Sequence, residues 1–141
     1  RTTSQSVYNI GLAEYVHKAY CPGRMQAVST IPESEVMQLH AEICAGLADP
    51  KRIMILYELV PGPRNVNDIA AALGAPQPQV SRHLKVLRER GMVTAERHGA
   101  AVAYTVADPR IIQALDLLRQ VLADKLRNQA ALAATVTSAS E

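Results

Sequence analysis

Apolar residues recur at three- and four-residue intervals along most of the chain, which is the spacing of one face of an α-helix. The first such run lies in residues 6–20. A second begins at Thr30 and Glu33, whose spacing is typical of a capping box. A third begins with Asp49 as the N-cap and Pro50 in the first helical position. The pattern therefore predicts three helices before the breaker PGP at residues 61–63.

A tight pair of helices is predicted after this breaker. Asn65 and Asp68 have capping-box spacing, and Gly74 marks the end of the short helix that they begin. A few residues later, residues 79–90 form a second, basic helix. Two helices joined by so short a turn have the layout of a helix-turn-helix.

Two strand-like runs follow the basic helix directly. They cover Met92–Arg97 and Val102–Val106, with His98 and Gly99 at the turn, and predict a β-hairpin. From Pro109 onward, apolar residues at helical spacing predict a long last helix that ends near residue 134. The fold class is therefore mainly α with a small β-hairpin.

Charge is concentrated around the helix pair. The net charge is +2 overall, but it is −2 over residues 1–50, +4 over 51–98 and zero over 99–141. In the basic helix, Val80, Leu84 and Leu87 are spaced to face inward, which leaves the polar side chains on the other face. Amide and cationic donors on such a face suit base edges and phosphates, although a merely solvated face has the same composition.

Four motifs together resemble the ArsR/SmtB family of winged-helix bacterial repressors. They are GLADPKRIMILYEL, NVNDIAAALG, QVSRHLKVLRERGMV and ERHGAAVAYTVADPR, and the resemblance covers about residues 36–125. It implies a winged helix-turn-helix with long N- and C-terminal dimerisation helices. It also implies a homodimer that binds an inverted-repeat operator in double-stranded DNA and releases it when an inducer binds.

The resemblance also assigns DNA contacts. On the basic helix the family's contact positions correspond to Gln77, Gln79, Ser81, Arg82 and His83, and Lys85 shares their polar face. The wing positions correspond to Arg97 and His98. Where many members have a serine that caps this helix and touches phosphate, this chain has Pro76, so we expect that contact to be missing.

Domain boundaries follow from the same pattern. We expect an N-terminal helix and linker in residues 1–31, a winged helix-turn-helix domain for DNA binding and dimerisation in 32–127, and a flexible C-terminal tail in 128–141. No repeat or low-complexity linker divides the chain.

Two metal sites of the resembled family lack their ligands in this chain. Residues 65–68, which correspond to its thiolate site, hold no Cys or His, and its last-helix Asp/His site corresponds to Asp108 and Arg110.

The N-terminal third offers a different set of ligands. His17 with Cys21, and His40 with Cys44, are each four residues apart, so each pair shares a helix face. Two imidazoles and two thiolates suit a tetrahedral site for zinc or another thiophilic metal.

Other uses of these residues stay open. Cys21 and Cys44 alone make a redox or sulfur-species switch, or bind a singly methylated arsenical; inorganic arsenite usually takes three thiolates. Haem is an alternative at the Cys21-Pro22 dipeptide, and Cys44 is also interpretable as a core residue.

The remaining function classes are less well supported. The chain has no phosphate-binding glycine motif, no HExxH and no GxSxG, so we do not expect an enzyme. A partner-binding or dimerisation module without effector sensing is the main alternative to a repressor. No apolar run is long enough to span a membrane, and the first residues lack the features of a signal peptide, so we expect a cytoplasmic protein.

Overall fold

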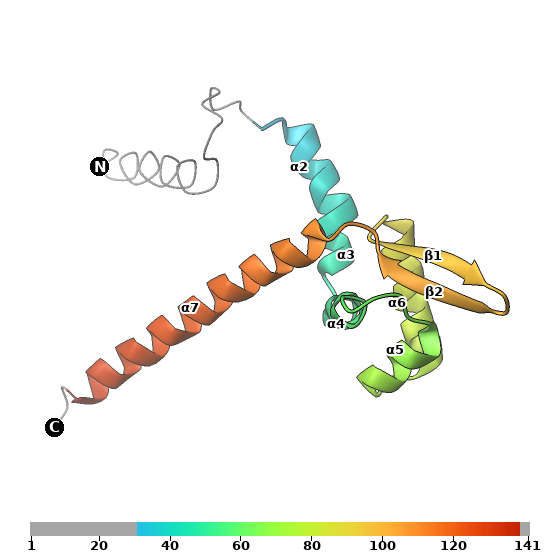
Figure 1. Cartoon of the computed structure of the whole chain (residues 1–141). Coiled ribbons are helices and arrows are strands. Elements are labelled where there is room, and N and C mark those ends of the chain that lie inside the picture. The colour runs from blue at the N-terminus through green and yellow to red at the C-terminus, as the bar shows by residue number, and fades with distance from the viewer. Residues whose placement is uncertain (1–30, 139–141) are drawn as a thin grey trace. The chain divides into compact units, whose positions relative to one another are not determined.

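The computed structural model describes residues 31–138 (Figure 1). Its elements are α2 (Glu33–Leu39), a π-helical turn η1 (His40–Cys44), α3 (Ala45–Leu47), α4 (Pro50–Glu58), α5 (Val66–Leu73), α6 (Gln77–Glu89), β1 (Val93–His98), β2 (Ala101–Val106) and α7 (Arg110–Ser138). They confirm a mainly α protein with a small antiparallel hairpin. The helix expected in residues 6–20 lies outside the described residues.

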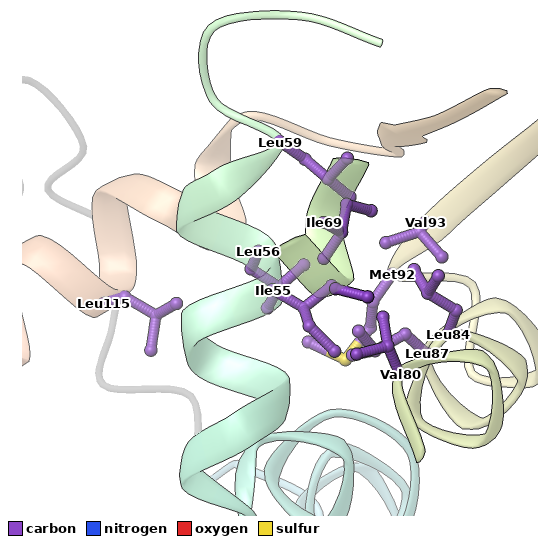
Figure 2. Packing of buried hydrophobic residues seen from close by; sticks show 11 residues of the cluster. Ile55, Leu56, Leu59, Ile69, Val80, Leu84, Leu87, Met92, Val93 and Leu115 are labelled. Carbon is purple, nitrogen blue, oxygen red and sulfur yellow. The ribbon is translucent and has the colours of Figure 1, made fainter. Parts of the chain in front are cut away.

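An apolar core joins α4, α5, α6, the start of β1 and the beginning of α7 (Figure 2). Its buried members are Ile55, Leu56, Leu59, Ile69, Ala70, Val80, Leu84, Leu87, Met92, Val93 and Leu115. The three inward positions predicted for the basic helix are among them. The core therefore holds α6 along one face and leaves its other face outside.

The predicted helix starts are confirmed at α4 and α5. The Asp49 carboxylate accepts a hydrogen bond from the backbone N–H of Lys51 at 2.8 Å, and Pro50 takes the first helical position. The Asn65 side chain accepts from the backbone N–H of Asp68 at 2.9 Å. Each side chain satisfies a donor that the first helical turn cannot pair internally.

The second helix differs from the prediction in its middle. The sequence predicts one regular helix up to Leu47, whereas the structure has a π-helical turn from His40 to Cys44 between α2 and α3. The N–H of Ala45 donates to the carbonyl of His40, five residues earlier. Regular helices pair residues four apart, so this turn holds one extra residue.

The hairpin has a regular register, from Val93 opposite Val106 to His98 opposite Ala101. It packs beside α6 (Figure 1). The loop before α5 joins it through Arg64, whose backbone exchanges hydrogen bonds of 3.1 and 2.8 Å with Tyr104. The hairpin is thereby anchored to the domain at its base.

The apolar side chains of helix α7 are buried near its start and exposed further along it. Leu115 is buried in the core, and Tyr57 of α4 donates a 2.7 Å hydrogen bond to Asp116. Beyond this point the large apolar side chains of the same stripe are exposed: Leu118, Val121, Leu122 and Leu126. No helix among residues 31–138 is both long enough and apolar enough to cross a bilayer.

The helix also continues further than the sequence predicts. It runs through Ser138, although residues 128–141 are predicted to be a flexible tail. Residues 129–134 are rich in alanine, the strongest helix former. The hydroxyls of Thr135 and Thr137 donate to the carbonyls of Leu132 and Ala133, so these side chains bond back to the helix instead of interrupting it.

Candidate nucleic-acid interface

The turn between α5 and α6 sets the direction in which α6 leaves the core. Gly74 ends α5 with a φ of 57°, a left-handed conformation in which any side chain is strained. The N–H of Ala75 then donates to the carbonyl of Ala70 at 3.0 Å. Pro76 follows as the N-cap of α6. Only residues 74–76 separate the two helices, which is the tight connection that the sequence predicts.

The outer face of α6 carries the polar residues assigned to DNA. Of these, Gln77, Ser81, Arg82 and Lys85 are exposed, and Gln79 and His83 are partly buried. Lys85 lies 3.8 Å from Glu89, but both side chains are mostly exposed, so this pair is weak. Among the described residues, Arg82 forms no ion pair. Its charge is available to a ligand.

The first turn of α6 lacks a side-chain cap, as expected from Pro76. The carbonyl of Pro76 accepts from the N–H groups of Gln79 and Val80 at 3.0 and 3.2 Å, so the helix starts without help from a hydroxyl. A serine-to-phosphate contact is therefore impossible at this position.

A shallow hollow of about 390 Å³ lies between α4 and α6. It is lined by Arg52, Gln79, Arg82, His83 and Val86. The sequence does not predict a role for Arg52, because nothing near it in the chain indicates that α6 will lie beside it. Its guanidinium donates to the carbonyls of Gly46 at 2.6 Å and Ala45 at 3.0 Å, which holds it beside α6.

The wing residues stand at the end of β1. Arg97 and His98 are both exposed, opposite Val102 and Ala101 in the register. His98 Nε2 lies 3.7 Å from a carboxylate oxygen of Glu96. The hairpin therefore presents cationic and imidazole donors away from the core, on the element that directly follows α6.

The four residues that the sequence offers as an inducer site lie only partly within the described chain. His40 and Cys44 lie at the two ends of η1, and both are exposed. The interpretation of Cys44 as a core residue is therefore wrong for the single chain, because its free thiol is exposed and lies outside the apolar cluster. His17 and Cys21 lie outside the described residues.

Asp108 and Arg110 form an ion pair at the start of α7. Arg110 donates to both oxygens of Asp108 at 3.0 Å from its Nε, and its backbone N–H donates to the same carboxylate at 2.9 Å. The side-chain hydrogen bonds from Arg110 lower the pKa of Asp108 to about 2. Within residues 31–138 no group of three or more His, Cys, Asp or Glu is placed to hold a metal ion.

Three comparisons relate this geometry to known proteins. Residues 49–95, from α4 to the middle of β1, match the family model for bacterial regulatory proteins of the arsR family. The repressor SmtB of Mycobacterium tuberculosis is 43% identical over 77 residues, which cover 55% of this chain and 57% of SmtB. The match thus spans little more than half the length of that relative.

Two further matches are longer. A probable mercury resistance operon repressor of Streptomyces lividans is 36% identical over 107 residues, covering 73% of this chain and 83% of that protein. The solution structure of Mb0332 from Mycobacterium bovis, described as a homodimeric winged helix-turn-helix DNA-binding domain, matches with a TM-score of 0.61 and 27% identity. That match covers 73% of this chain and 95% of Mb0332.

These matches confirm the winged helix-turn-helix fold and relate the chain to transcriptional regulators. The chain belongs to the ArsR family of bacterial regulatory proteins.

Proposed function

We propose that the chain is a homodimeric repressor that binds double-stranded DNA with α6 in the major groove and the hairpin as a wing. The observation that carries this proposal is that α6 is amphipathic. Its apolar seam, formed by Val80, Leu84 and Leu87, is fully buried, whereas its outer face is lined with amide, hydroxyl and cationic donors. The residues proposed to contact DNA are Gln77, Gln79, Ser81, Arg82, His83, Lys85, Arg97 and His98.

The uncovered stripe of α7 supports a dimer. The four large apolar side chains of this stripe, Leu118, Val121, Leu122 and Leu126, are more than half exposed in the single chain. Exposed apolar patches of this kind mark protein interfaces. Mb0332, which shares the fold, is described as homodimeric. A two-fold symmetric pair of α6 helices would bind an inverted-repeat operator with half-sites one helical turn apart.

Salt dependence tests the DNA-binding proposal. Duplexes selected by the protein from a randomised library would be titrated at several salt concentrations. The logarithm of the affinity should fall steeply with the logarithm of salt, by about 0.9 per phosphate contacted. If the protein selects no duplex, or if its binding does not respond to salt, the partner-binding module would be favoured instead. The apolar stripe of α7 is also suitable for such a module.

We infer that an inducer acting on His17, Cys21, His40 and Cys44 releases the operator. The exposure of the thiol of Cys44 and of His40 supports this inference, because both side chains are open to a ligand. They supply half of a four-ligand site for zinc or another thiophilic metal. A methylated arsenical, an oxidant or a sulfur species acts on the cysteines alone, and haem at Cys21 is the alternative. The mercury resistance repressor among the relatives is consistent with a thiophilic inducer.

The inducer proposal is tested with a Cys21→Ser, Cys44→Ser double variant. Zinc, methylarsenite and hydrogen peroxide should each be added to the wild type and to the variant in complex with the selected duplex. We expect at least one of them to release the wild type while the variant stays bound. Equal release of both proteins by every compound would contradict a role for the thiols. Because the proposed target is bacterial DNA, we place the protein in the cytoplasm.

A further inference from the structure

The π-helical turn η1 changes the hydrogen bonding of one carbonyl group. In a regular helix the N–H of Ala45 would donate to the carbonyl of Ala41, four residues earlier. Here it donates to His40 instead. The carbonyl of Ala41 therefore loses its usual partner and is available to another donor.

Arg90 supplies that donor. It is the C-cap of α6, and its Nη1 donates to the carbonyl of Ala41 across 49 positions in sequence. The guanidinium thus connects the end of the proposed recognition helix to the turn that carries Cys44.

The same segment is held closely by two further contacts. Arg52 of α4 donates to the carbonyls of Ala45 and Gly46. A Cβ added at Gly46 would lie 2.6 Å from Met92 Sδ and 3.1 Å from Arg90 Cδ, so a larger residue would require these side chains to shift. The backbone at residues 45 and 46 is therefore packed against Arg52, against Arg90 at the end of α6 and against Met92, which precedes β1.

We propose that Arg90 is a positioning residue that couples η1 to the recognition helix. When η1 keeps its π-helical turn, the carbonyl of Ala41 is free to accept from Arg90, and α6 is held at its C-terminal end as well as along its apolar seam. If the turn converts to a regular helix, the carbonyl returns to Ala45 and Arg90 is released. Because His40 and Cys44 lie on this turn, the coupling deepens the proposed function, on which it rests.

Hydrogen exchange at residues 40–47 measures this coupling in the full chain. The test compares wild type, Arg90→Gln and the matched control Arg88→Gln, which removes the same charge from an exposed position in the same helical turn. Without DNA, exchange at 40–47 should be faster in Arg90→Gln than in the other two proteins. This arm needs no operator, so it tests the hydrogen bond from Arg90 to Ala41 even if the proposed function fails. An Arg90→Lys variant retains a cationic donor and should restore part of the protection.

The second arm adds the selected duplex. In wild type and Arg88→Gln, saturation with DNA should slow exchange at 40–47 by about fivefold, the lower end of typical coupling between sites. In Arg90→Gln the same addition should leave exchange unchanged. An equal response in Arg90→Gln, or no response in a wild type that binds DNA, would overturn the coupling and leave DNA binding standing. A wild type that binds no duplex would overturn the proposed function and the coupling to DNA with it.

Discussion

The exposed stripe of α7 makes a quantitative prediction about assembly. In the single chain Leu118 is 62% exposed and Leu122 is 54% exposed. Full burial of a leucine is worth about 1.5–3 kcal/mol, so covering the remaining half should contribute about 1 kcal/mol per side chain. Two leucines from each of two protomers then contribute about 4 kcal/mol, which corresponds to about a thousandfold in the dissociation constant.

Replacing both leucines by glutamate should therefore separate the proposed dimer. The Leu118→Glu, Leu122→Glu variant loses the apolar contribution and also places like charges in the interface. Both side chains are exposed in the single chain, and glutamate is a good helix former, so α7 itself should persist. The control is Gln113→Glu, Gln120→Glu, which adds the same charge to the polar face of the same helix.

Sedimentation velocity at micromolar concentration provides the assay, with circular dichroism to check helix content. Wild type and the control should sediment as dimers, and the leucine variant as a monomer of unchanged helicity. The variant should also lose most of its affinity for a two-half-site duplex while it still binds weakly to one half-site. A leucine variant that sediments as a dimer, like the control, would refute the assignment of this stripe to the interface.

Three further predictions concern α6 and the start of α7. Arg82→Gln should make the salt slope of DNA binding less steep by about 1.8 for a dimer, at about 0.9 per phosphate contact, whereas Arg127→Gln on distal α7 should leave it unchanged. Leu84→Ala should lower the free energy of unfolding by about 2–5 kcal/mol in urea titrations, because the side chain is fully buried and its loss leaves a cavity. The pKa of Asp108 is lowered from 3.8 to about 2 by Arg110, so its stabilising effect is complete above about pH 4 and is lost as pH falls through about 2. Asp108→Asn should accordingly lower the melting temperature at pH 7 and much less at pH 2; an equal decrease at both would contradict the ion-pair explanation.

The ion pair at the start of α7 also bears on what the protein senses. The sequence places Asp108 and Arg110 where the resembled family has metal ligands in its last helix. In the structure the guanidinium contacts both carboxylate oxygens, so a cation already occupies the position in front of Asp108. This arrangement does not fit a metal site at α7, which leaves the residues of η1 and the N-terminal segment as the proposed inducer site.

The local features of the interface were predictable from the sequence because each depends on residues close together in the chain. Asn65 and Asp49 cap helices through donors two or three residues away. The seam of Val80, Leu84 and Leu87 follows directly from the helical repeat, which also leaves Arg82 on the opposite face. The hairpin needs only two short β-prone runs and a glycine between them.

Long-range features could not be predicted in the same way. The helical repeat of residues 33–47 does not reveal an extra residue at η1, because Val36, Leu39, Ile43 and Leu47 are spaced as in a regular helix. Neither the link from Arg90 to Ala41 nor that from Tyr57 to Asp116 has a local signal, because long side chains reach partners 49 and 59 positions away.

By itself, the sequence determined the helix-turn-helix, the polarity of α6 and the order of the elements, because capping and hydrophobic periodicity act over one or two helical turns. Only the tertiary structure decided which part of each apolar stripe is covered. Leu115 is buried in the domain core, whereas Leu118, one turn later, remains exposed. The reason is physical: periodicity defines which face of a helix is apolar, but burial depends on how far the neighbouring helices extend along that face.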